Sequence, residues 1–437
     1  MADFVVRRRR RILAAGAVLF LVGIGFGGPV ANKLTARSSD FQDPASEAMA
    51  AQTRLSDATG GRDGPGLVAL VRTRGDIRRD PAARRKIERV TRILAGQPEV
   101  GQVVSYTSAH DPSLVSRDGH AAFVAGSVKQ SQARAVVNRL RKQLAGHHVT
   151  IGGQQVVFTE IAHRVSHDLA RAELLAFPIL LLLSLWVFRG MVAALLPPLI
   201  GGVTIVTTFA LLRLVDAHVT TLSIFALNLV TGMGLGLAID YGLFMVSRYR
   251  EELARVGPGK EALSRTMATA GRTVLFSSLT VAAAVSTLLL FPLRFLYSMA
   301  IGGVICALIA AAVSLVVLPA VLAALGPRVN ALAPLRWQRA AEREASDTES
   351  GWWYRLSRIV MRRPVTIALA AATVLILAGL PFLRINFGAA DYRVLPTGSE
   401  ARQVSEAITS EFPRDPSEPF EVAIAAPRSA ASEVQSY

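Results

Sequence analysis

The distribution of apolar residues along the chain constrains its fold most strongly, because these residues gather in blocks of about 18 or more. Soluble proteins scatter their apolar residues, whereas a block of this length suits a helix that crosses a bilayer. We draw seven spans, at residues 12–30, 172–188, 191–215, 219–246, 273–291, 295–325 and 365–383. The predicted fold class is an α-helical polytopic membrane protein.

The basic residues lie beside the ends of these blocks and give the chain a net charge of +16. The run from Arg7 to Arg11 and the basic stretches 247–272 and 327–363 fall on one side if the spans alternate. Lys and Arg favour the cytoplasmic side, so the N-terminus is predicted to be cytoplasmic. A basic chain can also bind nucleic acid, but no nucleic-acid module is visible, so no such partner is expected.

Residues 35–170 alternate short β-rich runs with amphipathic helices and are predicted to form an extracytoplasmic soluble domain. Strands are expected at 66–71, 100–106, 121–128 and 149–151, and helices at 81–94 and 131–144. This βαββαβ order is typical of the split ferredoxin-like unit, an α+β fold. The full predicted division is 1–34 (basic N-terminus and first span), 35–170 (soluble domain), 171–326 (five-helix bundle), 327–363 (basic cytoplasmic linker), 364–384 (seventh span) and 385–437.

The segment around the first span recurs around the seventh. Asp40-Phe41 after the first span matches Asp391-Tyr392 after the last. A basic run followed by an apolar one can also be a cleaved signal peptide. An internal copy cannot be one, so the first span is interpreted as a retained anchor. Residues 385–437 are predicted to begin a second soluble domain, cut short by truncation or by a split or decayed gene.

Asp240 stands in the middle of an apolar block, roughly 12 Å along a helix from Arg248. A charged carboxylate at this depth costs at least a few kcal/mol and needs a reason. The functional interpretation is a proton carrier, because a low dielectric disfavours the charged form of a carboxyl group. The alternative is a structural hydrogen bond to a neighbouring helix. Tyr241 follows directly and either joins the relay or is an ordinary packing aromatic.

Small and hydroxyl residues surround this pair. Glycines allow helices to approach closely, so the glycines here are expected to serve helix packing: Gly232, Gly234, Gly236 and Gly242. Ser277 and Ser278 in the next span are relay neighbours, or they bond their own helix as serines in spans often do.

Other chemistry is not supported by the sequence. Glu160, His163, His167 and Asp168 are interpreted as a solvated helix face, because the two histidines lack the rest of a metal motif. No nucleophile–base pair and no phosphate-binding loop is visible, so the chain is not expected to be an enzyme or to use ATP. No catalytic residue, metal site or cofactor is predicted.

Two stretches carry a resemblance to a known family, AELLAFPILLLLSLWVFRGMVAALLPPLIGG at 172–202 and AIDYGLFMVSRYREEL at 238–253. With the repeat of span and soluble domain, the chain resembles MMPL transporters of the resistance-nodulation-division superfamily. The resemblance implies a βαββαβ porter domain outside the membrane. It also implies that Asp240 and Tyr241 belong to a proton relay, which an equivalent pair in a second half completes.

The function expected from this resemblance is proton-driven export of lipids or other hydrophobic compounds across the bacterial inner membrane, by a chain that holds half of such a pump. A lipid or amphiphile would be its substrate, membrane lipids would surround it, and a second chain could supply the missing half. The alternative is a non-transporting membrane scaffold or accessory subunit, or the remnant of a split transporter gene.

Overall fold

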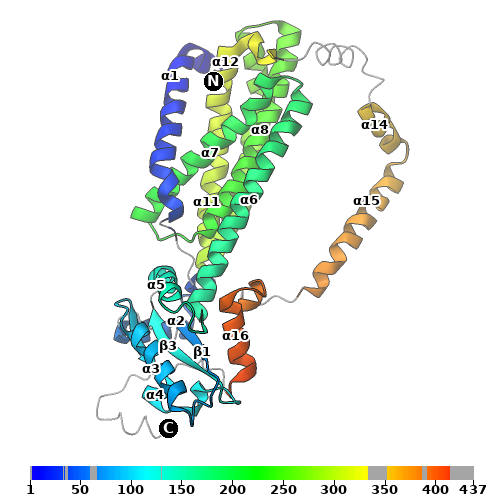
Figure 1. The fold of residues 1–437 in the computed structure, drawn as a ribbon. Helices are drawn as coiled ribbons and strands as arrows, with labels where there is room; N and C mark the ends of the chain where they lie inside the picture. Colours follow the sequence, from blue (N-terminus) through cyan, green and yellow to red (C-terminus); the bar gives the residue numbers. More distant parts are fainter. Residues whose placement is uncertain are drawn as a thin grey trace.

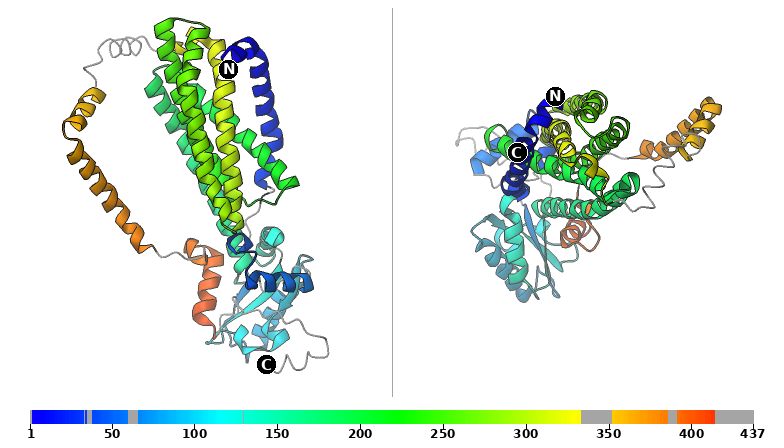
Figure 2. Two further views of the ribbon diagram at one scale, coloured as in Figure 1. Left: turned by 180° about the vertical axis from the view of Figure 1, so that it is seen from behind. Right: turned by 90° about the horizontal axis from the view of Figure 1, so that it is seen from above.

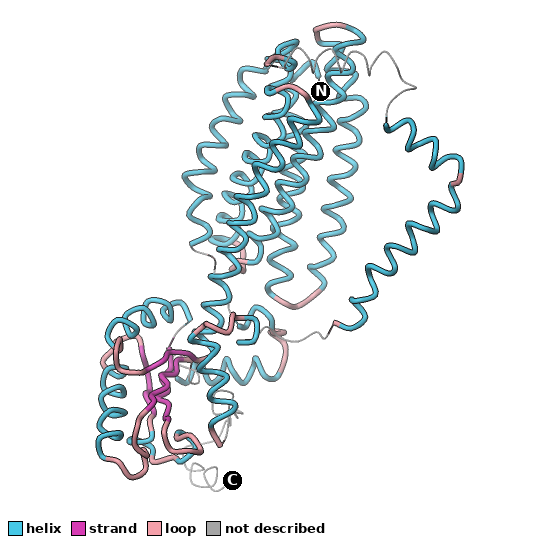
Figure 3. The backbone as a smooth tube through the Cα atoms, turned by 45° about the vertical axis from the view of Figure 1, so that its right-hand side comes forward, coloured by secondary structure: helices cyan, strands magenta, loops and turns pink. Residues whose placement is uncertain are grey.

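The fold was analysed in a computed structural model that describes residues 2–32, 34, 38–59, 66–128, 130–332, 352–385 and 391–413. It has two parts, a long helical bundle and a small α+β domain at one end of it (Figure 1). One continuous helix, α6 (Gln154–Phe188), runs from the α+β domain into the bundle. The sheet is confined to the small domain, and the rest of the described chain is almost entirely helical (Figure 3).

The bundle is built from the N-terminal helix and the helices that follow α6. In chain order its elements are α1 (Ala2–Val22), η1 (Gly23–Gly27), η2 (Gly28–Asn32), η3 (Ser38–Phe41), α7 (Met191–His218), α8 (Phe225–Val256), α9 (Lys260–Thr266), η5 (Met267–Gly271), α10 (Arg272–Ser286), η6 (Thr287–Leu290), α11 (Arg294–Ala312), η7 (Val313–Val317), α12 (Leu318–Leu325) and η8 (Gly326–Asn330). Helix α8 packs against both α7 and α11 and is the central helix of the bundle.

Within the described residues, six helical stretches are long and apolar enough to cross a membrane. They are Asp3–Val30, Met191–His218, Phe225–Val256, Lys260–Leu290, Arg294–Asn330 and Pro364–Arg384. The remaining predicted span, the second in chain order at 172–188, is the last part of α6, whose apolar run Leu174–Phe188 is roughly 22 Å long. The boundary predicted between residues 170 and 171 falls inside α6, because this single helix belongs to the α+β domain at its start and to the bundle at its end.

Two predicted boundaries in the bundle are wrong. The span predicted from residue 219 begins at Phe225, because side chains take the preceding backbone donors: Leu222 N donates to Asp216 and Ser223 N to Ser298. The helix predicted to end at residue 246 continues to Val256, and α9 starts at Lys260, so most of the basic stretch 247–272 is helical.

The four-stranded antiparallel sheet has the order β2-β3-β1-β4 and confirms the ferredoxin-like prediction. Its elements are β1 (Leu67–Arg72), α3 (Pro81–Ala95), β2 (Val100–Val104), β3 (Ala121–Val128), α5 (Gln130–Gln143) and β4 (Val149–Gly152), with α2 (Glu47–Thr59) before them and the short α4 (Tyr106–Ala109) and η4 (Pro112–Leu114) between β2 and β3. Helix α3 shows how the pattern folds. Asp80 caps its first turn, and Ile87, Val90 and Leu94 recur on the face that it buries.

Every residue of β3 is buried, because both faces of the sheet are covered. On one face Ala122 and Val124 pack in the core with α3 and α5. On the other face Phe123 packs against Ile408 and Phe412, from α16 (Glu400–Glu411) and the residue after it. Helix α16 belongs to the region after residue 385, which was predicted to begin a second soluble domain. In the structure it covers the outer face of the first domain's sheet.

Polar contacts hold α16 on the sheet as well. Arg72 binds Glu411 through two hydrogen bonds of 2.7 and 3.0 Å, and this pairing raises the pKa of Arg72 above its ordinary value. Arg141 of α5 binds Glu400 at 2.8 Å. Gly152 of β4 allows the close approach, since a Cβ there would lie 2.5 Å from Cβ of Val404.

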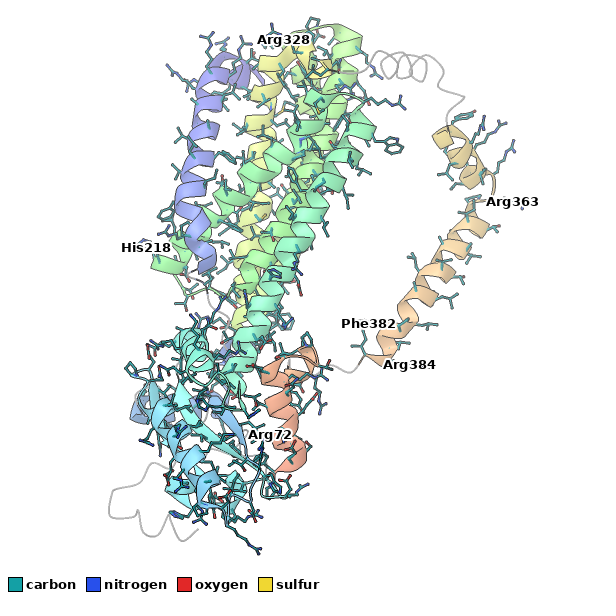
Figure 4. The ribbon with its side chains drawn as sticks, viewed as in Figure 1. Arg72, His218, Arg328, Arg363, Phe382 and Arg384 are labelled. Atoms are coloured by element: carbon teal, nitrogen blue, oxygen red, sulfur yellow. The ribbon has the colours of Figure 1, made fainter. Side chains whose placement is uncertain are left out.

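The last span stands apart from the bundle. Helices α14 (Trp352–Arg362) and α15 (Pro364–Gly379), with η9 (Leu380–Arg384), lie to one side in both views of Figure 2, and no residue of α15 is buried. The short η10 (Tyr392–Val394) then leads to α16. The N-terminus (Figure 1) and Arg328 (Figure 4) lie at the end of the bundle away from the α+β domain.

Candidate functional site

The predicted proton carrier lies near the middle of α8. Asp240 is about 22 Å along the helix from Phe225 and about 24 Å from Val256. Its side chain is exposed at the surface of the bundle rather than enclosed among the helices. Asp240 therefore lies at mid-span depth, on a surface that no other described helix of the bundle covers.

Asp240 belongs to an exposed row of residues spaced four apart on α8: Gly232, Gly236, Asp240 and Phe244. Residues at this spacing share one helix face. A Cβ added at Gly232 or Gly236 would meet nothing within 4 Å among the described residues. We refer to these four residues as the Asp240 stripe. Two glycines and a carboxyl group make this stripe poorly suited to contact acyl chains, and well suited to contact another helix.

Tyr241 turns into the bundle and is 5% exposed. Its hydroxyl donates to Ser277 Oγ of α10 at 3.5 Å, which is long compared with about 2.7 Å for a strong O–H···O bond. The structure thus brings together two of the predicted relay residues, Tyr241 and Ser277, across the α8–α10 contact.

Ser278 does not join them. Its hydroxyl donates to the backbone carbonyl of Leu275 at 2.8 Å in its own helix. This is the alternative that sequence left open for serines in spans.

The other two predicted packing glycines face inward. A Cβ at Gly234 would lie 2.9 Å from Sγ of Cys306 on α11, and one at Gly242 would lie 3.0 Å from Pro197 on α7. Gly234 and Gly242 are thus contact points of α8 within this bundle, whereas Gly232 and Gly236 lie on the Asp240 stripe.

A second carboxylate was singled out only as a repeat match. Asp40 is 1% exposed and accepts a hydrogen bond of 2.6 Å from Ser223 Oγ, at the start of α8. Arg294, at the start of α11, lies 3.7 Å away and also donates to the carbonyl of Thr221. Phe41 packs its ring on Phe225. Asp40 therefore ties the chain after α1 to the domain-side ends of two central helices, a role that only its recurrence at Asp391 could have signalled.

The segment from Arg248 to Glu252, which follows Asp240-Tyr241 on α8, stabilises the opposite end of the bundle. Arg248 bonds Glu252 at 2.6 Å and Glu251 at 2.7 Å. Arg250 donates to the carbonyl of Phe188 at 2.8 Å, which satisfies an otherwise unpaired acceptor at the C-terminus of α6. The arginines of this segment are structural in this arrangement.

Apolar side chains cover much of the outer surface of the helices. Leu174 on α6, Phe276 on α10 and Leu375 on α15 are between 72% and 77% exposed, as suits contact with acyl chains. The fold and this surface define a multi-pass membrane protein that carries a β-containing domain at one end.

The chain belongs to the MMPL family, whose sequence profile matches residues 40–367. The trehalose monomycolate exporter MmpL3 of Mycolicibacterium smegmatis is 30% identical to it, over 95% of this chain and 44% of that protein. A putative membrane protein of Streptomyces coelicolor is 33% identical, over 94% of this chain and 57% of that protein. The mycolic acid-containing lipids exporter MmpL11 of M. smegmatis is 36% identical, over 54% of this chain and 24% of that protein. The chain spans about half the length of MmpL3 and of the Streptomyces protein.

Proposed function

We propose that this chain is one half of a proton-driven transporter that exports a lipid or another amphiphile across the bacterial inner membrane. The observation that carries the proposal is the Asp240 stripe, which presents a carboxyl group at mid-span depth on an open helix face. Two of the relatives are named as exporters of mycolic lipids, which supports a lipid as cargo.

In this proposal Asp240 takes up a proton and releases it on the other side. A neutral Asp240 is compatible with apolar surroundings, whereas the charged form needs a polar partner. A second helical bundle packs on the Asp240 stripe and supplies that partner, either from a separate chain or from further sequence. In this proposal Tyr241, the next residue on α8, is also part of the relay, with Ser277 of α10 as its hydrogen-bond partner.

The same proposal fixes the orientation in the membrane. The basic N-terminus and Arg328 lie on the cytoplasmic side, and the α+β domain lies outside, where it serves as a porter domain. Export then proceeds from the membrane toward this domain. Proton influx would drive it, because each proton crosses toward the cytoplasm as the carrier alternates between its two sides.

The test is a substitution at the native locus, where any partner half is present. Asp240→Asn is expected to reduce surface appearance of newly made lipid, measured by labelling intact cells, to the level of the gene deletion. Asp240→Glu keeps a titratable group and is expected to retain part of the export. Glu88→Gln, at an exposed carboxyl group on α3, is the matched control. Full export by Asp240→Asn would exclude the proton-carrier role.

A further inference from the structure

Helices α5 and α6 lie side by side where α6 leaves the α+β domain (Figure 1), and a groove lies between their side chains. It has a volume of about 540 Å³, and its walls are rich in cations. Arg134 and Arg141 come from α5, and Arg164 and Arg171 come from α6. We call it the basic groove. The sequence interpretation of this part of α6 as a plain solvated face did not foresee a groove, because α5 supplies its other wall.

Two of the four guanidinium groups are already paired with carboxylates. Arg164 bonds Glu160 at 3.3 Å, and Arg141 bonds Glu400 at 2.8 Å. Among the described side chains, the structure gives no carboxylate partner to Arg134 or Arg171.

The contact that Arg134 does make is to a histidine. Arg134 Nη2 lies 3.3 Å from Nε2 of His163. Glu160 and Asp168 also line the groove, where Glu160 pairs with Arg164 and Asp168 lies 3.8 Å from His167. Arg134 therefore has no carboxylate partner among the described side chains, and it lines a cavity that is large enough for a phosphate group and its ester substituents.

The groove lies beside the start of the apolar run of α6. Arg171 is three residues before Leu174, the first residue of the apolar run of α6, so the two are about 5 Å apart along the helix. Leu174, Leu175 and Phe177 continue along the same helix and are 47% to 75% exposed. A ligand that places a charged group in the groove can thus lay an acyl chain on α6.

We propose that the basic groove binds the anionic phosphate headgroup of a membrane lipid, held by Arg134 and Arg171. Guanidinium groups bind phosphate oxygens through paired hydrogen bonds, and the groove holds two that lack carboxylate partners. The proposal rests on the proposed function only for the view that an amphiphile is the cargo. Lipid binding itself needs neither transport nor a second half of the pump.

The test is lipid retention by the purified full chain in a non-ionic detergent, measured by native mass spectrometry. Phosphatidylglycerol is titrated against phosphatidylcholine, whose headgroup carries no net charge. Phosphatidylglycerol is expected to bind at about tenfold lower concentration, since a charge-assisted hydrogen bond is worth roughly one factor of ten or more. Arg134→Gln with Arg171→Gln is expected to remove this preference. Arg85→Gln with Arg89→Gln, on exposed positions of α3 outside the groove, removes the same charge and is expected to preserve it.

The outcomes separate the sources of phosphate. Competition by millimolar inorganic phosphate that abolishes the lipid adduct would make this a site for soluble anions and overturn the proposal. Equal phosphatidylglycerol binding by the groove variant and the parent chain would overturn it too. The adduct is expected to persist in Asp240→Asn. Loss of export in that variant with lipid binding intact would therefore separate the headgroup site from the proton step.

Discussion

At the scale of single residues, Asp40 and Asp240 show how burial distinguishes two carboxyl groups in one bundle. Asp40 is enclosed and accepts from Ser223, with Arg294 nearby. Asp240 lies on an open helix face. Burial beside a cation and a hydroxyl donor makes Asp40 an anchoring contact, whereas the open face leaves Asp240 accessible to a partner that packs there.

Asp40→Ala is expected to lower the stability of the bundle. It removes an acceptor for Ser223 and leaves Arg294 without its carboxylate, at a cost of about 1–3 kcal/mol. Thermal unfolding of the purified chain in detergent measures this. Asp43→Ala is the matched control, because Asp43 lies three residues further along and caps only an exposed turn. Equal melting temperatures for both variants would contradict the anchoring role of Asp40.

Asp240 and Tyr241 could be identified as site candidates from the sequence, because an acidic residue inside an apolar block is visible without any knowledge of the three-dimensional structure. It could not tell Ser277 from Ser278. The two differ only in helix phase, and a rotation of about 100° turns one toward Tyr241 and the other toward its own backbone. The anchor at Asp40 was also hidden, since its partners lie more than 180 residues away in the chain.

At the scale of elements, substitutions at the inward-facing and the outward-facing glycines of α8 are expected to have opposite effects. Gly242→Leu is expected to destabilise the bundle by about 1–3 kcal/mol, because its side chain would enter the space occupied by Pro197. Gly236→Leu is expected to leave the melting temperature of the purified chain unchanged, since its Cβ meets no described atom. In cells, Gly236→Leu is nevertheless expected to reduce export, because it obstructs the face on which a second bundle is proposed to pack. Normal export by Gly236→Leu would argue against that packing.

Helix α16 was predicted to belong to a second domain, and its place on the first sheet follows from its apolar face. Ile408→Ala is expected to weaken the packing of α16 on the sheet by about 2–4 kcal/mol of free energy, because Ile408 is buried against the sheet. Faster hydrogen exchange across residues 400–411 would report the change. Gln403→Ala, on the exposed side of the same helix, is expected to have no effect. Unchanged exchange in Ile408→Ala would mean that α16 does not depend on this contact.

The sheet itself was predictable strand by strand, since each strand is a short apolar run bounded by turn residues. Its outer cover was not, because α16 lies more than 240 residues after β4 in the chain. The sequence of β3 contained a signal of this cover. A strand with one solvated face would alternate apolar and polar residues, whereas residues 121–128 are apolar or small except for Ser127.

At the scale of the whole molecule, the basic N-terminus and the α+β domain lie at opposite ends of the bundle. The single cysteine, Cys306, is buried, so a maleimide is expected to react with an introduced cysteine and not with Cys306. A membrane-impermeant maleimide added to spheroplasts is expected to label Gln132→Cys on α5 and to spare Arg328→Cys until the membrane is opened. The reverse pattern would invert the proposed topology.

The central claim is that Asp240 holds an exchangeable proton within the membrane, and carbodiimide labelling tests it most directly. Hydrophobic carbodiimides react with protonated carboxyl groups in apolar surroundings, and peptide mass spectrometry identifies the modified residue. Asp240 of the full chain in lipid nanodiscs is expected to be labelled at neutral pH, with labelling that falls as the pH rises, while Glu88 stays unmodified. Absence of labelling at Asp240, or labelling that does not change with pH, would exclude a proton carrier at this position.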